Sequence, residues 1–140
     1  SISIETSLDP FLTKTDSLTG SLVSLVGNLP EPVSRIKIKA ELFKEVLGEE
    51  SHKAVEPVKT KEMLMLNVDT TITVGIVETV KKSKDFLGLQ KSSEKISAEI
   101  NKNEIELALN IPIIALKGSN LGIARNINSH WRLIGWGEVI

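Results

Sequence analysis

The stretch Ile36-Lys37-Ile38-Lys39-Ala40-Glu41-Leu42 decides the fold class, because apolar and charged residues alternate along it. A period of two is typical of a β-strand that has one buried face and one solvated face. The continuously apolar run Met63 to Leu66 indicates a strand buried on both faces. Further strand signals lie at 71–80, 104–109 and 131–139. Several short strands separated by turn residues favour a barrel or a sandwich, so we predict an all-β protein.

The clearest break in the chain is Gly27-Asn28-Leu29-Pro30-Glu31-Pro32. Proline has no N–H to donate to a neighbouring strand, so two prolines this close together exclude a central strand. We therefore predict a domain boundary here, with residues 1–30 ending one domain and residues 31–140 forming a second. Because the sequence starts with strand-like alternation and without methionine, we interpret the chain as a fragment of a longer protein.

A Lys-rich stretch, Lys81 to Asn103, interrupts the strand pattern. Ile96 and Ile100 lie four residues apart within it, which is the spacing of one helix face. We predict a long loop that includes one helical stretch after Ser92.

The composition limits the classes of function. The 140 residues carry a formal net charge of −1, which argues against a strong non-specific polyanion binder but is compatible with a local basic patch. The chain has no cysteine, which excludes a disulfide framework, a zinc finger and a thiol nucleophile. This composition fits a reducing compartment, and we expect a cytoplasmic protein. No apolar run approaches the ~18 residues of a membrane span, so we expect no membrane partner.

Sequence patterns that carry enzymatic chemistry are missing. A phosphate-binding loop of the form GxxxxGK[ST] is not found, and the nearest stretch, Gly20 to Gly27, has no lysine after its second glycine. His52 and His130 have no local partners for a metal site, and no serine lies in a GxSxG elbow. We predict no catalytic residue, no metal ligand and no bound cofactor in this chain.

Basic residues and one aromatic residue remain as candidates for a contact with RNA or with a protein partner. Lysine and arginine can neutralise phosphates without reading a base sequence. For any single candidate, a solvated strand face is the commoner explanation, so only a cluster in space would support a contact. The candidates are Arg35, Lys37, Lys39, Lys81, Lys82, Arg125, His130, Arg132 and Trp136.

Both tryptophans of the chain, Trp131 and Trp136, lie in the final strand signal. They are an odd number of residues apart, so in a regular strand they point to opposite faces. We predict that one fills the interior and that the other marks a contact on an outer face. Gly135 and Gly137 beside Trp136 indicate a bulge or a close approach of another backbone.

Three collinear motifs resemble one known family, the gamma subunit of archaeal and eukaryotic translation initiation factor 2. The segment Leu8-Asp9-Pro10-Phe11-Leu12-Thr13-Lys14-Thr15-Asp16-Ser17-Leu18 resembles LDPxLTKxDxL, late in domain II of that family. The stretch Val55 to Val68 resembles VEPIKxxExLMLNVG of domain III, and Ile127 to Gly137, ending in HWRLIGWG, resembles the end of that domain. Asp69 departs from a frequent glycine, and 124–126 is Ala-Arg-Asn in place of Ser-Arg-Arg, with one cation fewer.

The resemblance implies an elongation-factor-Tu-like C-terminal antiparallel β-barrel. Residues 1–30 would be the end of domain II, and residues 31–140 would be domain III. The parent protein would be a GTPase that uses GTP and Mg²⁺ in an upstream G domain. The implied partners are the alpha and beta subunits of the same factor, initiator methionyl-tRNA, the small ribosomal subunit and an ATP-grasp assembly chaperone.

Our leading hypothesis is a non-catalytic barrel that packs on the G domain of a factor delivering initiator methionyl-tRNA to the small ribosomal subunit. This barrel would also offer a docking face to the ribosome or to the chaperone. One alternative is a docking domain for the chaperone, with no RNA role in isolation. Another is the equivalent barrel of a different translational GTPase, of the selenocysteine-specific or elongation class.

Overall fold

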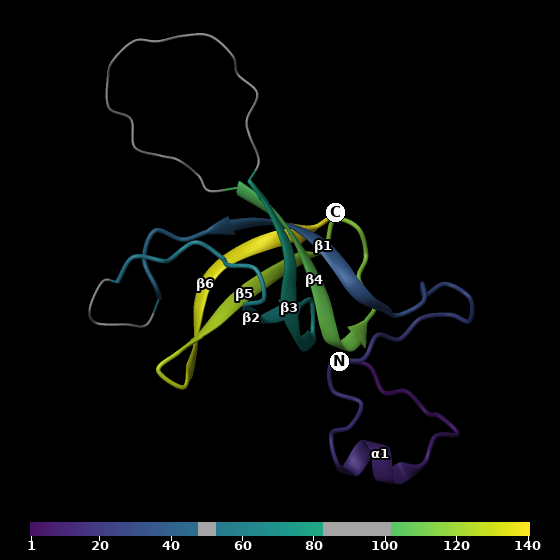
Figure 1. Ribbon diagram of the computed structural model, residues 1–140. Helices are drawn as coiled ribbons and strands as arrows, with labels where there is room; N and C mark the ends of the chain where they lie inside the picture. The colour runs from purple at the N-terminus through teal and green to yellow at the C-terminus, as the bar shows by residue number, and fades with distance from the viewer. Residues whose placement is uncertain (48–52, 83–101) are drawn as a thin grey trace, which may run out of the picture.

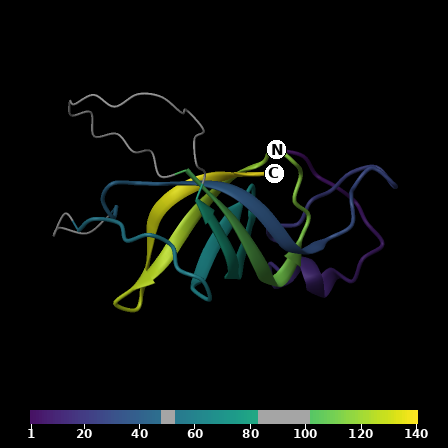
Figure 2. The ribbon, with the colours of Figure 1, turned by 45° about the horizontal axis from the view of Figure 1, so that its top comes forward.

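Six antiparallel β-strands close into a barrel in the computed structural model of the chain, which describes residues 1–47, 53–82 and 102–140 (Figure 1). The order around the barrel is β1-β4-β3-β2-β5-β6, and β1 lies between β4 and β6 (Figure 2). This architecture confirms the predicted all-β antiparallel barrel. The strands are β1 (Val33–Leu42), β2 (Met63–Val68), β3 (Thr71–Lys82), β4 (Lys102–Ile113), β5 (Asn120–Ile127) and β6 (His130–Val139).

The interior of the barrel is filled by aliphatic side chains from all six strands. Along β1, Ile36, Ile38 and Ala40 are buried while Lys37 and Lys39 are exposed, as the sequence alternation predicts. Burying one such aliphatic side chain stabilises the fold by about 1.5–3 kcal/mol. The core side chains with at most 1% exposure include Ile38, Leu64, Leu66, Val77, Ile105, Leu107, Ile123 and Ile134.

A bulge in β6 changes which of its residues face the interior. Ile123 of β5 lies opposite Gly135, but the next residue, Ala124, lies opposite Leu133. Ile134 is therefore an extra residue on β6, without a counterpart on β5. Its side chain is fully buried, so the bulge contributes to the core and also reverses the inward and outward positions along the strand.

This reversal places both tryptophans on the outer surface. Trp131 is 38% exposed and Trp136 is 45% exposed. The prediction that one of them fills the interior is wrong, because it assumed a regular strand between them. The single extra residue, Ile134, takes the interior position instead.

Two glycines of β6 allow its backbone to lie close against β1. A Cβ atom on Gly135 would lie 2.5 Å from the carbonyl oxygen of Glu41, and one on Gly137 would lie 2.9 Å from that of Lys39. Contacts this short are not found for real side chains, so both positions require glycine. The bulge and the close approach that these glycines indicated in the sequence are both confirmed.

Tight turns join β2 to β3 and β5 to β6. Asp69, in the β2–β3 turn, has a φ of 51°, a left-handed conformation that glycine adopts more easily than aspartate. This conformation accounts for the glycine that the family pattern often has there. In the β5–β6 turn, Asn128 and Ser129 have φ values of 50° and 67°, as the two central residues of a type I′ hairpin do.

The stretch predicted as a long loop is partly strand at both ends. β3 continues through Lys82 and β4 begins at Lys102, so the prediction is wrong for the outermost residues. Lys81 lies opposite Glu104 in the β3–β4 ladder, where the opposite charges favour pairing despite a weak strand signal. The helical stretch predicted after Ser92 lies outside the described residues.

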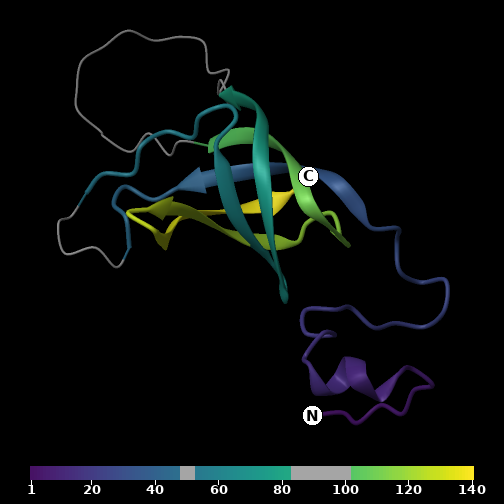
Figure 3. The same ribbon diagram turned by 60° about the horizontal axis from the view of Figure 1, so that its bottom comes forward.

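Residues 1–32 lie to one side of the barrel and include one short helix, α1 (Pro10–Lys14) (Figures 1 and 3). The Asp9 carboxylate caps this helix by accepting a hydrogen bond from the Phe11 N–H at 2.9 Å. The Gly20 carbonyl accepts a hydrogen bond from the Thr71 hydroxyl, which links the segment to the barrel. The domain boundary proposed near Pro30 stays a prediction.

Candidate functional site

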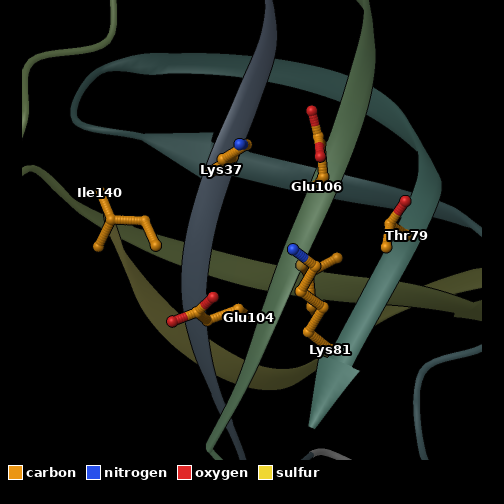
Figure 4. A pocket seen from close by; sticks show the side chains of 7 residues that line it. Lys37, Thr79, Lys81, Glu104, Glu106 and Ile140 are labelled. Atoms are coloured by element: carbon orange, nitrogen blue, oxygen red, sulfur yellow. The ribbon is translucent and has the colours of Figure 1, made fainter. Parts of the chain in front are cut away.

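The candidate residues of β1 lie on an outer face where acidic and basic side chains alternate. Lys37 pairs across the ladder with Glu106 of β4, and Lys39 lies between Glu104 of β4 and Glu138 of β6. Figure 4 shows side chains of β1, β4 and β3 lining one shallow pocket, with Lys37 and Lys81 beside the two β4 glutamates. The cations of this face are opposed by carboxylates, so it is not a continuous basic patch.

Of the remaining basic candidates of β1 and β3, Arg35 and Lys81 also have an acidic neighbour, whereas the ladder partner of Lys82 is uncharged. Arg35 forms an ion pair with Glu78 at 3.2 Å, and its side chain is 67% exposed. Exposed pairs of this kind contribute only about 0–1 kcal/mol. Lys81 lies opposite Glu104, and Lys82 lies opposite Asn103 at the end of β3. Their role as RNA or partner contacts stays a prediction.

Arg125 has a different environment, because its guanidinium group is engaged within the barrel. It forms an ion pair with Glu62, in which Nη2 lies 3.1 Å from Oε2 and Nε also donates to the carboxylate. Nη1 donates to the Glu56 carbonyl at 2.9 Å and Nη2 donates to the Pro57 carbonyl at 3.3 Å. The Arg125 side chain is only 13% exposed. These contacts fix the segment before β2 against the end of the barrel.

His130 and Arg132 lie near Arg125 at the turn end of the β5–β6 hairpin. Arg132 is the cross-strand neighbour of Arg125, and His130 lies opposite Ile127. The His130 ring interacts with the Asn128 carbonyl at 2.9 Å, which holds it against the turn. Lys39, by contrast, pairs with Glu138 of β6. Glu138 is eight residues from His130 along this strand, which corresponds to roughly 26 Å at the rise of an extended strand. The structure therefore separates the basic candidates into two groups.

We expect Arg125→Ala to lower the free energy of unfolding by about 2–3 kcal/mol, because the substitution leaves the Glu62 carboxylate and two carbonyls without their donor at a poorly hydrated site. Urea denaturation of the purified chain measures the change. Arg132→Ala is the matched control, since Arg132 is on the neighbouring strand, and it should cost less than about 1 kcal/mol. Equal losses for the two variants would contradict a stabilising role for the Arg125 contacts.

Away from the face where acidic and basic side chains alternate, β2, β3 and β6 carry exposed apolar side chains, and β5 lies between β2 and β6. Met63 lies opposite Ile76 in the β2–β3 ladder, and both side chains point outward. We define the apolar surface by its most exposed large side chains, which are Met63 (54%), Ile72 (61%), Ile76 (46%), Trp131 (38%), Leu133 (41%) and Trp136 (45%). Exposed apolar side chains in such numbers mark interaction sites in many proteins.

Sequence reasoning missed this surface, apart from Trp136. The prediction of burial on both faces for Met63 to Leu66 is wrong for Met63 and only partly right for Met65. The sequence signal for this surface is that Met63 to Leu66 has no polar residue at either its outward or its inward positions. That signal does not distinguish a strand covered by protein on both sides from one whose outer face is left open.

Trp136 separates two pockets on the barrel surface. One, of about 300 Å³, lies over Gly122 and is lined on the apolar side by Phe43, Leu133 and Trp136. The other, of about 150 Å³, lies on the β1 side of the same ring and is lined by Lys39, Glu41 and Glu138. Among the candidates named from the sequence, Trp136 is the one that borders both of these pockets, and Lys39 lines the second.

Within the described residues, no group of three or more His, Cys, Asp or Glu side chains is arranged to hold a metal ion. In the same part of the chain, every helix is too short or too polar to span a membrane.

The chain is an antiparallel β-barrel domain of six strands. It has one face where opposite charges alternate and another where apolar side chains are exposed. The chain belongs to the family described as Initiation factor eIF2 gamma, C terminal, whose model matches residues 34–95 and 93–139. This match confirms the family suggested by the three motifs, in preference to another translational GTPase.

The chain is also similar over 99% of its length to archaeal proteins named translation initiation factor 2 subunit gamma. It is 42% identical to that of Methanococcus maripaludis strain C7 over 139 residues, 38% to that of Pyrococcus furiosus over 138 residues and 36% to that of Aeropyrum pernix over 138 residues. The chain spans 29%, 29% and 28% of the length of these relatives, respectively.

Proposed function

We propose that this chain is the non-catalytic C-terminal barrel of a GTPase subunit that delivers initiator methionyl-tRNA to the small ribosomal subunit. The observation that carries the proposal is the family match over the residues that form the barrel. The sequence also lacks a phosphate-binding loop, as expected for a chain whose GTP and Mg²⁺ site belongs to an upstream G domain. The activity would take place in the cytoplasm, with the alpha and beta subunits as partners.

The barrel would act by packing on the G domain and by offering a docking surface. Exposed apolar side chains support a role in protein contacts, since leaving this much aliphatic and aromatic surface in water is unfavourable. Residues 1–30, as the end of domain II, would join the barrel to the rest of the protein. Their own apolar side chains are largely exposed here, Val26 and Leu25 among them.

A second candidate function is a protein-docking domain for an ATP-grasp assembly chaperone, with no RNA role in isolation. The observation that favours it is the charge balance on β1, β4 and β3, where Lys37, Lys39 and Lys81 are each opposed by a glutamate. Phosphate binding depends on uncompensated cations, and neighbouring carboxylates oppose it. The apolar surface, in contrast, needs no net charge to bind a protein.

A nucleotide titration tests the proposed function. We expect the 140-residue chain to show no saturable binding of GTP in the presence of Mg²⁺ by calorimetry, because the nucleotide site would belong to upstream residues. The full-length gene product, as the positive control, should bind GTP with one site per chain. Saturable, magnesium-dependent binding by the isolated chain would overturn the claim that it is the non-catalytic part.

A further inference from the structure

We propose that the two pockets beside Trp136 form a docking site for a partner protein segment in which an apolar side chain lies next to a lysine or arginine. This inference rests on one part of the proposed function, namely that the barrel binds a protein partner. It adds the position of the site and the chemistry of the segment that it recognises.

The pocket over Gly122 provides the apolar half of the site. Gly122 lies between Trp136 of β6 and Asn67 of β2 in the ladder, and its missing side chain leaves the floor open. An added Cβ would lie 3.5 Å from Cδ1 of Leu133 and 4.0 Å from Cβ of Asn67, so a methyl-sized group fits there in ordinary van der Waals contact. Phe43, Leu133 and Trp136 form an apolar wall against which an apolar side chain can pack, while Asn67, Asp69 and Asn120 line the rest of the pocket.

The pocket on the β1 side of Trp136 provides the cationic half. Glu41 lies directly opposite Trp136 across the β1–β6 ladder, and Glu138 lies two residues further along β6 on the same outer face. A lysine or arginine placed here would lie against the indole ring and between two carboxylates. Lys39 is also part of this pocket, but it lies opposite Glu138 and also borders Glu104.

The charges of the complete site decide which kind of partner fits. Its two pockets are lined by three carboxylates, of Glu41, Asp69 and Glu138, and by one ammonium group, of Lys39. The Asp69 carboxylate is held at the rim by a hydrogen bond from the Ser119 hydroxyl at 3.1 Å. A net negative lining opposes phosphate groups, which disfavours RNA. A second copy docking through the same face would bring these carboxylates together, so a basic and apolar protein segment is the complementary occupant.

The described part of the chain leaves the site open to a separate partner. The N-terminal segment contacts the barrel through the Gly20 carbonyl and Thr71, and with that segment in place Trp136 is still 45% exposed and Leu133 41% exposed. We therefore assign the site to a partner polypeptide and treat upstream residues of the same protein as an outcome of the test.

A fluorescence titration tests the site. In a Trp131→Phe background, the remaining indole emission reports on Trp136 alone, since the chain has two tryptophans. The probe is a short peptide of alternating leucine and arginine, and we expect saturable quenching. The double variant Glu41→Gln, Glu138→Gln should weaken binding roughly tenfold through loss of the charged contacts. Gly122→Leu should abolish binding by filling the apolar pocket, provided that its thermal transition is unchanged.

Matched controls separate this site from general charge effects. Glu106→Gln removes a carboxylate from the charge-balanced face, outside both pockets, and should leave the affinity within about twofold. A peptide of alternating leucine and glutamate should not bind. If Gly122→Leu does not fold, the glutamate double variant and the Glu106→Gln control still decide the question.

The inference is overturned if the leucine–arginine peptide causes no saturable quenching, or if Glu106→Gln weakens binding as much as the double variant does. It is also overturned by stronger quenching with oligouridine RNA than with the peptide, or by self-association of the chain through Trp136. A further contrary result is peptide binding by the 140-residue chain that is lost in the full-length gene product. The last result would mean that upstream residues occupy the site. A chain that binds neither GTP nor the peptide would leave the proposed function standing and remove only this site.

Discussion

Gly135→Ala is expected to lower the free energy of unfolding by about 3 kcal/mol, the upper end of the usual cost of forcing extra atoms into a packed site. The added methyl group would lie 2.5 Å from the Glu41 carbonyl oxygen and 3.0 Å from Cα of Leu42. Both are backbone atoms, so no side-chain rotation relieves the contact. The β1 and β6 backbones would have to separate, which weakens the ladder that closes the barrel.

The matched control is Gly122→Ala, on the neighbouring strand of the same surface. A Cβ there lies in ordinary contact, 3.5 Å from the nearest atom, and alanine loses less backbone entropy on folding than glycine does. We expect a change within about 0.5 kcal/mol, measured by urea denaturation alongside Gly135→Ala. If Gly122→Ala proved as damaging as Gly135→Ala, the effect would reflect strand glycines in general and not the close approach of β1.

Leu107→Ala is expected to cost about 3–4 kcal/mol, because the Leu107 side chain is fully buried in the centre of the core. Leu107 lies opposite Ile36 of β1 and Val77 of β3, both buried, so its loss leaves a cavity bounded by two neighbouring strands. Thermal and urea unfolding of the purified variant measure this change.

Trp131→Ala is the informative comparison for Leu107→Ala. Tryptophan is much the larger side chain, and an interior tryptophan would cost about 3–5 kcal/mol when truncated. Trp131 lies on the outer surface with 38% exposure, so we expect a loss of only about 1 kcal/mol. A greater loss for Trp131→Ala than for Leu107→Ala would show that the outer surface contributes more to stability than the burial pattern indicates.

The strands were predictable from the sequence where one face is buried and the other is charged. The alternation of Ile36 to Leu42 and of Glu104 to Leu109 gave both the strand and its inward residues correctly. This works because a one-residue slip would place every lysine or glutamate in the core. The family motifs added the closed barrel, which alternation alone did not distinguish from a sandwich.

Features that depend on pairing between distant segments were not predictable in the same way. The extra residue Ile134 is defined by the register of β6 against β5, and local sequence carries no direct record of that register. The Arg125–Glu62 pair joins residues 63 positions apart, and neither residue has an unusual local context. Gly135 and Gly137 were informative in the sequence, because a glycine within a strand often marks a bulge or a close approach of another backbone.

The candidate site shows the same division. Trp136 was identified from its rarity and its position, but its neighbours Glu41, Gly122 and Leu133 come from three different strands. The barrel order that brings them together is a property of the whole fold. The basic candidates were individually visible, whereas the glutamates that oppose them became apparent only with the ladder register.

The position of β1 in the barrel has a consequence for synthesis of the protein on the ribosome. Its two neighbours are β4 and β6, the latter through the pairing of Ile38 with Val139. A nascent chain that has not yet reached β6 therefore presents unpaired edges on both β1 and β5. Long-range pairing of this kind is slow, and open edges favour aggregation. Barrel closure should thus wait until β6 has left the ribosome, and stalled translation products that end before His130 should aggregate.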